Sequence, residues 1–130
     1  MKPYYIAILS LLISGCGPEE PKQTESQKPK ETLGQQLALI EFNRQPSATD
    51  PYVVKLDSMI SLLSLRYKEP KDTIADYTQK CNAVLAADHI METNLDLMMG
   101  VHNMGEVPNT KYREAIVIIA VMIKAQNKSR

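Results

Sequence analysis

A run of nine consecutive apolar residues, Ala115 to Ile123, constrains the fold of this chain more than any other feature. The run is too apolar to lie in water, and it is far shorter than the roughly 18 residues that a membrane-spanning helix needs. It therefore belongs in the core of a folded domain. Its β-branched residues also suit a buried strand, but the neighbouring segments have the pattern of helices, and a lone strand has no partner. The run predicts a central helix that Thr110 caps and that extends to Gln126.

The rest of the chain after residue 33 repeats apolar residues every three or four positions, which is the period of an amphipathic helix. The clearest pattern lies between Pro51 and Tyr67, directly after Asp50, and an Asp–Pro pair is typical of a helix start. Further helices are predicted over 33–43, 70–88 and 93–103. The predicted fold class is all-α, with a small bundle of about four to five helices over residues 34–126 and a flexible tail over 127–130.

Length and composition exclude several classes of protein. The chain has 130 residues, which gives room for one small domain. Lys+Arg and Asp+Glu both number 15, which excludes a nucleic-acid binder held by bulk positive charge. The 2 cysteines are too few for a disulfide-rich scaffold.

The first residues have the three parts of a secretory signal peptide. Lys2 supplies the positive start, and Ile6 to Ile13 form an apolar stretch that is too short to span a bilayer. Ser14 and Gly15 are small residues that suit a cleavage site. We therefore predict a signal peptide over residues 1–15.

The sequence Ile13-Ser14-Gly15-Cys16 resembles the lipobox of bacterial lipoproteins, in which an aliphatic residue and two small residues precede a cysteine. The resemblance implies that diacylglycerol is attached to the sulfur of Cys16 and that the signal peptide is cut after Gly15. It also implies that the new amino group of Cys16 receives an acyl chain such as palmitate. Several acyl chains on one residue form a stable membrane anchor. Gly17 after the anchor implies transport to the outer membrane, facing the periplasm, in a Gram-negative host.

Residues 16–33 are predicted to be the lipidated cysteine followed by a disordered linker. Between Gly17 and Thr32 the chain has three prolines, alternating charges and no large apolar side chain, so it cannot pack a core. A flexible chain of this length spans roughly 20–25 Å. The linker is expected to hold the helical domain away from the lipid headgroups.

Six polar residues in the helical region are of types that can carry chemistry: Asp72, Asp76, His89, Glu92, Asp96 and His102. The spacing of His89, Glu92 and Asp96 is that of metal ligands on one helix face. The intervening Ile90 indicates a helix junction that would separate them. The aspartates near helix starts are explained by the helix dipole. We expect no metal site, no catalytic residues and no cofactor other than the lipid on Cys16.

The remaining candidates are sulfur-containing side chains. Cys81 lies on an apolar helix face, which favours a buried thiol, although an exported protein can use a single cysteine for an intermolecular disulfide. Methionines form adaptable binding surfaces more readily than other apolar residues do. Met98, Met99 and Met104 are therefore candidates for a binding surface, although methionines more commonly fill space in a core.

The predicted function is that of a membrane-anchored lipoprotein whose helical domain binds a protein partner in the cell envelope. An accessory, exclusion or immunity role fits this class equally well. Two alternatives remain open, a passive structural lipoprotein and a small envelope hydrolase. The hydrolase predicts that Asp72, Asp76, His89 or His102 converge in a pocket, whereas the binding domain predicts an exposed apolar patch.

Overall fold

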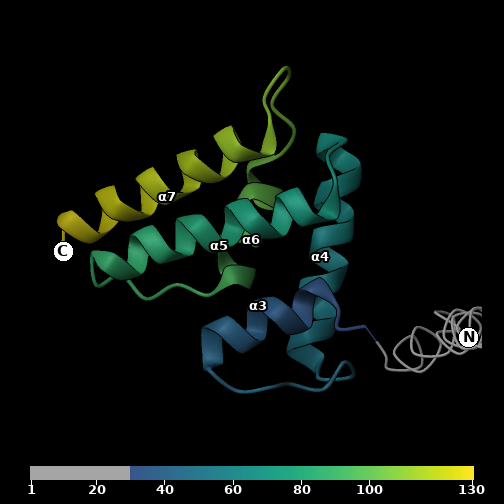
Figure 1. The fold of residues 1–130 in the computed structure, drawn as a ribbon. Coiled ribbons are helices and arrows are strands. Elements are labelled where there is room, and N and C mark those ends of the chain that lie inside the picture. Colours follow the sequence, from purple (N-terminus) through teal and green to yellow (C-terminus); the bar gives the residue numbers. More distant parts are fainter. Residues whose placement is uncertain (1–29) are drawn as a thin grey trace, which may run out of the picture. The chain divides into compact units, whose positions relative to one another are not determined.

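A computed structural model describes residues 30–130 of the chain (Figure 1). The chain divides into two units, residues 1–30 and residues 31–130, and the fold is that of the second unit. The predicted signal peptide, the cleavage site at Gly15, the lipid attachment at Cys16 and the linker up to residue 29 lie outside the described residues. These features remain predictions.

The described unit is an all-α domain of five helices, as predicted. In chain order the helices are α3 (Leu33–Phe42), α4 (Pro51–Tyr67), α5 (Lys71–Ala87), α6 (Asn94–Met104) and α7 (Tyr112–Lys128). In Figure 1, α5 and α7 lie side by side and run in the same direction, while α4 crosses near their starting ends. The first helix, α3, packs on α4 and α5.

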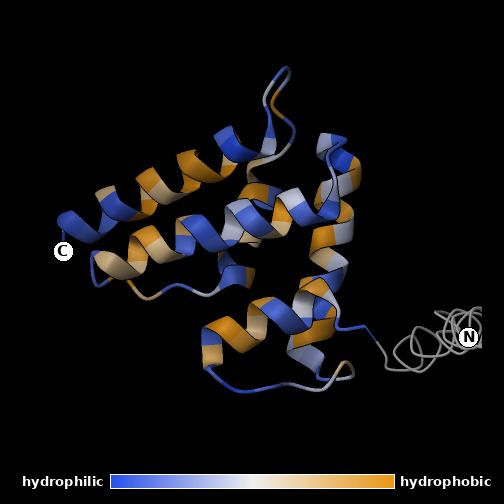
Figure 2. Cartoon of the chain, in the orientation of Figure 1, coloured by the Kyte–Doolittle hydropathy of each residue, from blue (hydrophilic) through white to orange (hydrophobic). Residues whose placement is uncertain are grey.

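The core lies where α4, α5, α6 and α7 meet, and Figure 2 shows apolar segments in orange along these helices. Its largest fully buried side chains include Leu56, Ile60, Leu63, Ile74, Leu85, Leu97, Met98, Tyr112 and Ile116. No helix within residues 30–130 is long and apolar enough to cross a membrane.

Local capping explains where the first helices begin. The Thr32 hydroxyl accepts a hydrogen bond from the backbone N–H of Gln35, whose side chain accepts in return from the Thr32 backbone. Asp50 accepts from the N–H of Tyr52 at 2.8 Å, directly before the predicted Pro51 start. Such side chains satisfy N–H groups that have no partner within the helix.

The predicted cap of the last helix is wrong. Thr110 bonds locally to the carbonyl oxygen of Pro108, and α7 begins two residues later at Tyr112. The backbone N–H of Tyr112 instead donates to the carboxylate of Glu69, at 2.9 Å. A carboxylate suits the positive end of a helix, and this one comes from a residue 43 positions away.

The apolar run is helical, as predicted, but it is not central. Its inner residues, such as Ile116 and Ile119, are buried against α5 and α6, whereas Val117 and Val121 on the other side are 51% and 59% exposed. The helix lies at an edge of the domain, and only half of its circumference is covered by the part of the chain that the structure describes.

Two glycines allow helices to approach closely. A Cβ atom on Gly34 would lie 2.8 Å from both the Asp57 carboxyl carbon and the carbonyl oxygen of Val53, so α3 can dock on α4 only without a side chain there. The N–H of Gly34 uses this proximity to donate to Asp57 at 2.7 Å. A Cβ on Gly100 would meet Ile119 at 2.9 Å, which marks the contact between α6 and α7.

Buried polar groups form specific bonds between the helices. Glu41 on α3 accepts from the hydroxyl of Tyr52 at 2.5 Å and from the backbone N–H of Asn94 at 2.9 Å. Between α5 and α7, the hydroxyls of Thr78 and Tyr112 are 2.6 Å apart. Burial raises the pKa of both tyrosines, and the bond to Glu41 raises the pKa of Tyr52 further.

Candidate functional site

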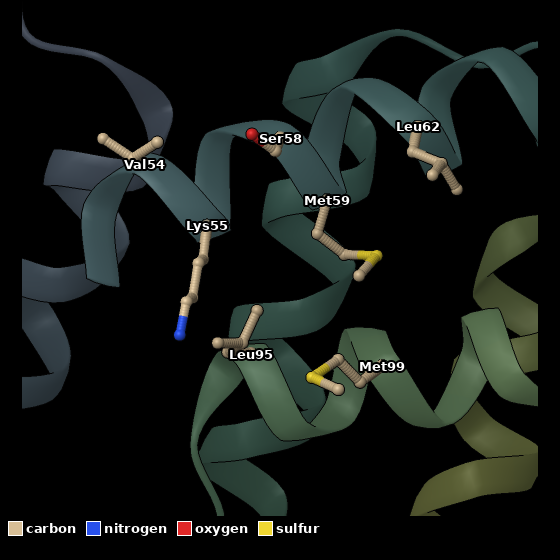
Figure 3. Close-up of a pocket in the computed structure, with 7 residues that line it drawn as sticks. All are labelled: Val54, Lys55, Ser58, Met59, Leu62, Leu95 and Met99. Carbon is tan, nitrogen blue, oxygen red and sulfur yellow. The ribbon is translucent and has the colours of Figure 1, made fainter. Parts of the chain in front are cut away.

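A groove runs between α4 and α6 on the surface of the domain (Figure 3). We call it the α4–α6 groove; its volume is about 390 Å³, and it is lined by Val54, Lys55, Ser58, Met59, Leu62, Leu95 and Met99. Met59 and Met99 face each other from the two helices. The lining is apolar except for Lys55 and Ser58.

The groove exists because α4 carries apolar residues outside the face that it buries. Its inner face contains Leu56 and Ile60, which are fully buried. Beside this face, Val54 is 48% exposed and Leu62 is 40% exposed. Side chains four positions apart lie next to one another on a helix, so this second stripe faces the neighbouring helix α6, where Met99 is 41% exposed.

Lys55 is the only charged residue that lines this groove. Within residues 30–130, ion pairs join Lys80 to Asp76 and Lys124 to Asp88, and Lys55 takes part in neither pair. The groove therefore combines an apolar floor with a cation at its edge. Such a site can bind apolar side chains together with a carboxylate.

A second groove separates α5 from α7. This α5–α7 groove has a volume of about 270 Å³ and is lined by Tyr77, Lys80, Cys81, Val84, Val117, Ala120, Val121 and Lys124. Cys81 is one of its lining residues and is half-buried, and burial raises the pKa of its thiol. A raised pKa leaves less reactive thiolate at neutral pH, which agrees with a packing role for this side chain.

The methionines predicted as one binding surface occupy different environments. Met98 is fully buried in the core, and Met104 is partly buried against it. Met99 lines the α4–α6 groove, where its neighbour across the groove is Met59 rather than Met98 or Met104. Successive residues of an α-helix are rotated by about 100° around its axis, so Met98 and Met99 point to different sides of α6.

The metal-like spacing of His89, Glu92 and Asp96 does not lead to a cluster. Helix α5 ends at Ala87 and α6 begins at Asn94, so the first two residues lie in the connection and Asp96 lies in the first turn of the next helix. His89 has a left-handed backbone with φ of 61°, as is common after a helix C-terminus. Residues 30–130 contain no group of three or more potential metal ligands.

The acidic and histidine candidates for catalysis also lie apart. Asp72 and Asp76 line a crevice beside α3, and Asp76 pairs with Lys80 at 2.8 Å. His89 follows the opposite end of α5, a helix of 17 residues and therefore about 25 Å long. His102 lies near the end of α6. The convergence that a hydrolase predicts is not formed by these residues.

His102 has a partner that its sequence position did not suggest. Arg66 on α4 donates to the backbone carbonyl oxygen of His102 at 3.0 Å, and it contacts the ring nitrogen Nδ1 at 3.1 Å. A guanidinium group can only donate, so Nδ1 accepts this bond. The arrangement holds the C-terminal turn of α6 against α4, next to the α4–α6 groove.

The sequence did not indicate most of the α4–α6 groove. Val54, Lys55 and Leu62 were not predicted as site residues. The available signal was the presence of Val54 and Leu62 outside the buried face of α4, since surplus apolar residues on a helix indicate a second contact surface.

Comparison with protein-family models, with curated proteins and with solved structures found no match to this chain.

Proposed function

We propose that this chain is a membrane-anchored lipoprotein whose α4–α6 groove binds an apolar helical segment of another envelope protein. The observation that carries the proposal is the groove itself, an apolar channel between two helices with one lysine at its edge. Anchoring through Cys16 is proposed from the lipobox resemblance of residues 13–16.

The shape and lining of the groove favour a helix as its occupant. Grooves between helices commonly receive the apolar face of an amphipathic helix, which inserts residues spaced three and four positions apart. The flexible thioethers of Met59 and Met99 can adjust to such side chains. Because Lys55 has no carboxylate partner among the described residues, we expect an Asp or Glu beside the apolar face of the bound helix.

The proposed anchor increases the effect of a modest affinity. Attachment to the membrane confines the domain to a thin layer, which raises its effective concentration for partners in the same layer. In a Gram-negative host, the proposed location is the periplasmic face of the outer membrane. The partner is then an envelope protein with a helix exposed within reach of the linker.

Site-specific photocrosslinking in intact cells tests this function. A photoreactive amino acid replaces Ser58, and the crosslinked peptide is identified by mass spectrometry. We expect one discrete partner, crosslinked through an apolar helix with a nearby acidic residue. Leu62→Glu should abolish this crosslink, whereas Leu65→Glu should preserve it, because Leu65 is on the same helix, 80% exposed, and does not line the groove.

The other outcomes of this experiment contradict the proposal. A crosslink that survives Leu62→Glu would show binding elsewhere on the domain. Adducts to lipid alone would identify the groove as a lipid site, and the absence of any adduct would favour a passive structural lipoprotein. Circular dichroism of the Leu62→Glu and Leu65→Glu chains controls for loss of folding.

The anchor is tested separately by mass spectrometry of the protein from its native cells. Processing predicts that the chain begins at Cys16 and carries a diacylglycerol and an acyl group. Detection of an unmodified Cys16 together with the original Met1 contradicts the anchor. Replacement of Cys16 by alanine should release the domain from membranes without changing its helical content.

A further inference from the structure

The start of α6 is held by residues of other helices. The backbone N–H of Asn94, the first residue of α6, donates to the carboxylate of Glu41 on α3 at 2.9 Å. The N–H of Leu95 donates to the hydroxyl oxygen of Tyr52 on α4 over 3.5 Å, which is a long bond. The third N–H of the helix differs, since its partner is the nearby hydroxyl of Thr93. The first N–H groups of a helix have no partner within it, so α3 and α4 supply acceptors that α6 lacks.

Glu41 joins three helices through its two carboxylate oxygens. One oxygen accepts from the hydroxyl of Tyr52 at 2.5 Å, and the other accepts from the N–H of Asn94. Burial, and then the bond to Glu41, raises the pKa of Tyr52, so its hydroxyl stays protonated and remains a donor. Hydrogen bonds to a charged group are stronger than those between neutral groups. Glu41 therefore links the last turn of α3 to α4 and to the start of α6.

Asn94 has little freedom to replace this partner. It is fully buried, and its side-chain oxygen accepts from Asn82 at 2.9 Å while its side-chain nitrogen donates to Gln79 at 3.4 Å. Both of these partners lie on α5. A buried N–H without an acceptor is unfavourable. Without Glu41, the start of α6 is therefore expected to move until water reaches the Asn94 N–H.

These contacts define one end of the α4–α6 groove. Leu95 on α6 and Lys55 on α4 both line the groove (Figure 3). Each lies within one helical turn of a residue that Glu41 binds, so the separation of the two helices at this end follows from the Glu41 contacts. At the other end, the bond from Arg66 to His102 joins the same two helices. The apolar part of the groove thus lies between two polar links.

Glu41 is in place only while α3 is docked. This helix has 10 residues, whereas α4, α5 and α7 each have 17, and the side chains that it buries are those of Leu37 and Ala38. Near its start, the N–H of Gly34 donates to Asp57 on α4 at 2.7 Å. The docking of α3 therefore depends on a small buried surface and on polar contacts near its two ends.

We propose that the docking of α3 controls the α4–α6 groove, with Glu41 as the positioning residue. Docked α3 places the Glu41 carboxylate against α4 and the start of α6, which fixes the width of the groove. Undocked α3 removes this acceptor, and the start of α6 moves away from α4. A preorganised site binds more tightly, because less freedom is lost on binding. The effect on a partner rests on the proposed function of the groove, whereas the effect on its width does not.

Distances between spin labels test the positioning without a partner. The full chain carries one of two label pairs and no other thiol: Ser58→Cys with Asp96→Cys, or Val84→Cys with Val121→Cys, each with Cys16→Ala and Cys81→Ala. All four labelled positions are exposed. The first pair measures the separation of α4 from α6, and the second pair measures the separation of α5 from α7 as a control.

Removal of the carboxylate should change one of these distances. Glu41→Ala should lengthen and broaden the α4–α6 distance and leave the α5–α7 distance unchanged. Gly34→Ala should have the same effect with Glu41 present, because its Cβ would lie 2.8 Å from the carbonyl oxygen of Val53. Glu41→Gln keeps one acceptor oxygen and should give a smaller change. Gln36→Ala, at an exposed position of α3, should give none.

Two results of the distance measurements would overturn the proposal. An unchanged α4–α6 distance in Glu41→Ala would show that this residue does not set the groove. Equal changes in both distances would show that it only stabilises the domain as a whole.

The photocrosslink at position 58 measures the consequence for binding. Glu41→Ala should reduce its yield about ten-fold, the factor that corresponds to one hydrogen bond to a charged group. A full yield in Glu41→Ala would contradict control by α3. Absence of the crosslink in the unaltered chain would contradict the proposed function alone, and the label distances would then decide whether α3 positions α6.

Discussion

The two grooves of the domain are built alike and differ in their charges. Each lies between two helices, has an apolar floor and is open to solvent. The α4–α6 groove has a lysine, Lys55, outside the ion pairs of the described chain, whereas both lysines of the α5–α7 groove are paired with aspartates. An apolar surface alone does not select a partner, because its contribution is not directional. The charges at its edge decide whether the surface also favours an acidic partner.

The largest expected change in stability distinguishes a core residue of α6 from its neighbour in the α4–α6 groove. Met98→Ala should lower the free energy of unfolding by about 2–5 kcal/mol, because it opens a cavity at a fully buried position. Met99→Ala, one residue later, should change stability by less than about 1 kcal/mol and instead weaken partner crosslinking from position 58. Urea denaturation of both variants measures the difference. Similar losses of stability would show that Met99 belongs to the core.

Alkaline pH should weaken the packing beneath the α5–α7 groove. Burial raises the pKa of Tyr112 above its ordinary value near 10. Above about pH 10 the unfolded chain loses this proton while the folded chain keeps it, so the stabilisation present at lower pH declines by about 1.4 kcal/mol per pH unit. Denaturation between pH 9 and pH 11 should show a shallower decline for Tyr112→Phe, and an unchanged slope in this variant would contradict the assignment. These pH values are about one unit on either side of the ordinary tyrosine pKa.

A change of charge distinguishes the two grooves directly. Lys55→Glu should reduce crosslinking to the partner at position 58 about ten-fold, with a larger reduction at low salt, because repulsion replaces attraction to the acidic residue. Lys124→Glu, which changes a lysine of the α5–α7 groove, should leave this crosslink intact. An equal reduction by both substitutions would show that the effect of Lys55 is not specific to its groove.

The smallest expected effect concerns the ion pairs of the two lysines in the α5–α7 groove. The bond from Lys124 lowers the pKa of Asp88, so its contribution is present above the unfolded pKa, near 4, and is lost as the pH falls below it. The bond to Asp76 raises the pKa of Lys80, so that contribution is lost above about pH 10. Both pairs are exposed, and exposed pairs contribute little. Asp88→Asn should therefore have the smallest effect on the free energy of unfolding among these variants, and urea denaturation at neutral pH measures it.

The predictable part of the fold rests on neighbours in the chain. The Asp50–Pro51 pair marks the start of α4 because the cap and its receiving N–H are two residues apart. The junction after His89 was predictable because nearby residues interrupt the apolar period. The cap of α7 was not, since Glu69 reaches Tyr112 from another helix and no local pattern records that approach.

For the candidate site, only the type of one lining residue, methionine, was predictable from the sequence. Methionines were expected at a binding surface, and Met99 does line the α4–α6 groove. The sequence does not distinguish Met98 from Met99, because both are apolar and adjacent, and their roles depend on which side of α6 is buried. Lys55 gave no signal of its own, since a lysine on a helix is ordinarily a solvated side chain.

The sequence by itself determined that this chain forms helices, where α4 and the junction after α5 lie, and that the run Ala115 to Ile123 contributes to the core. These properties follow from local propensity, capping and apolar period, which act over a few residues. Tertiary structure alone decided that α7 lies at an edge, that Glu69 caps it and that residues 30–130 leave two apolar grooves uncovered. Those outcomes depend on how whole helices are arranged, because the residues that bury one helix face are its neighbours in space rather than in the chain.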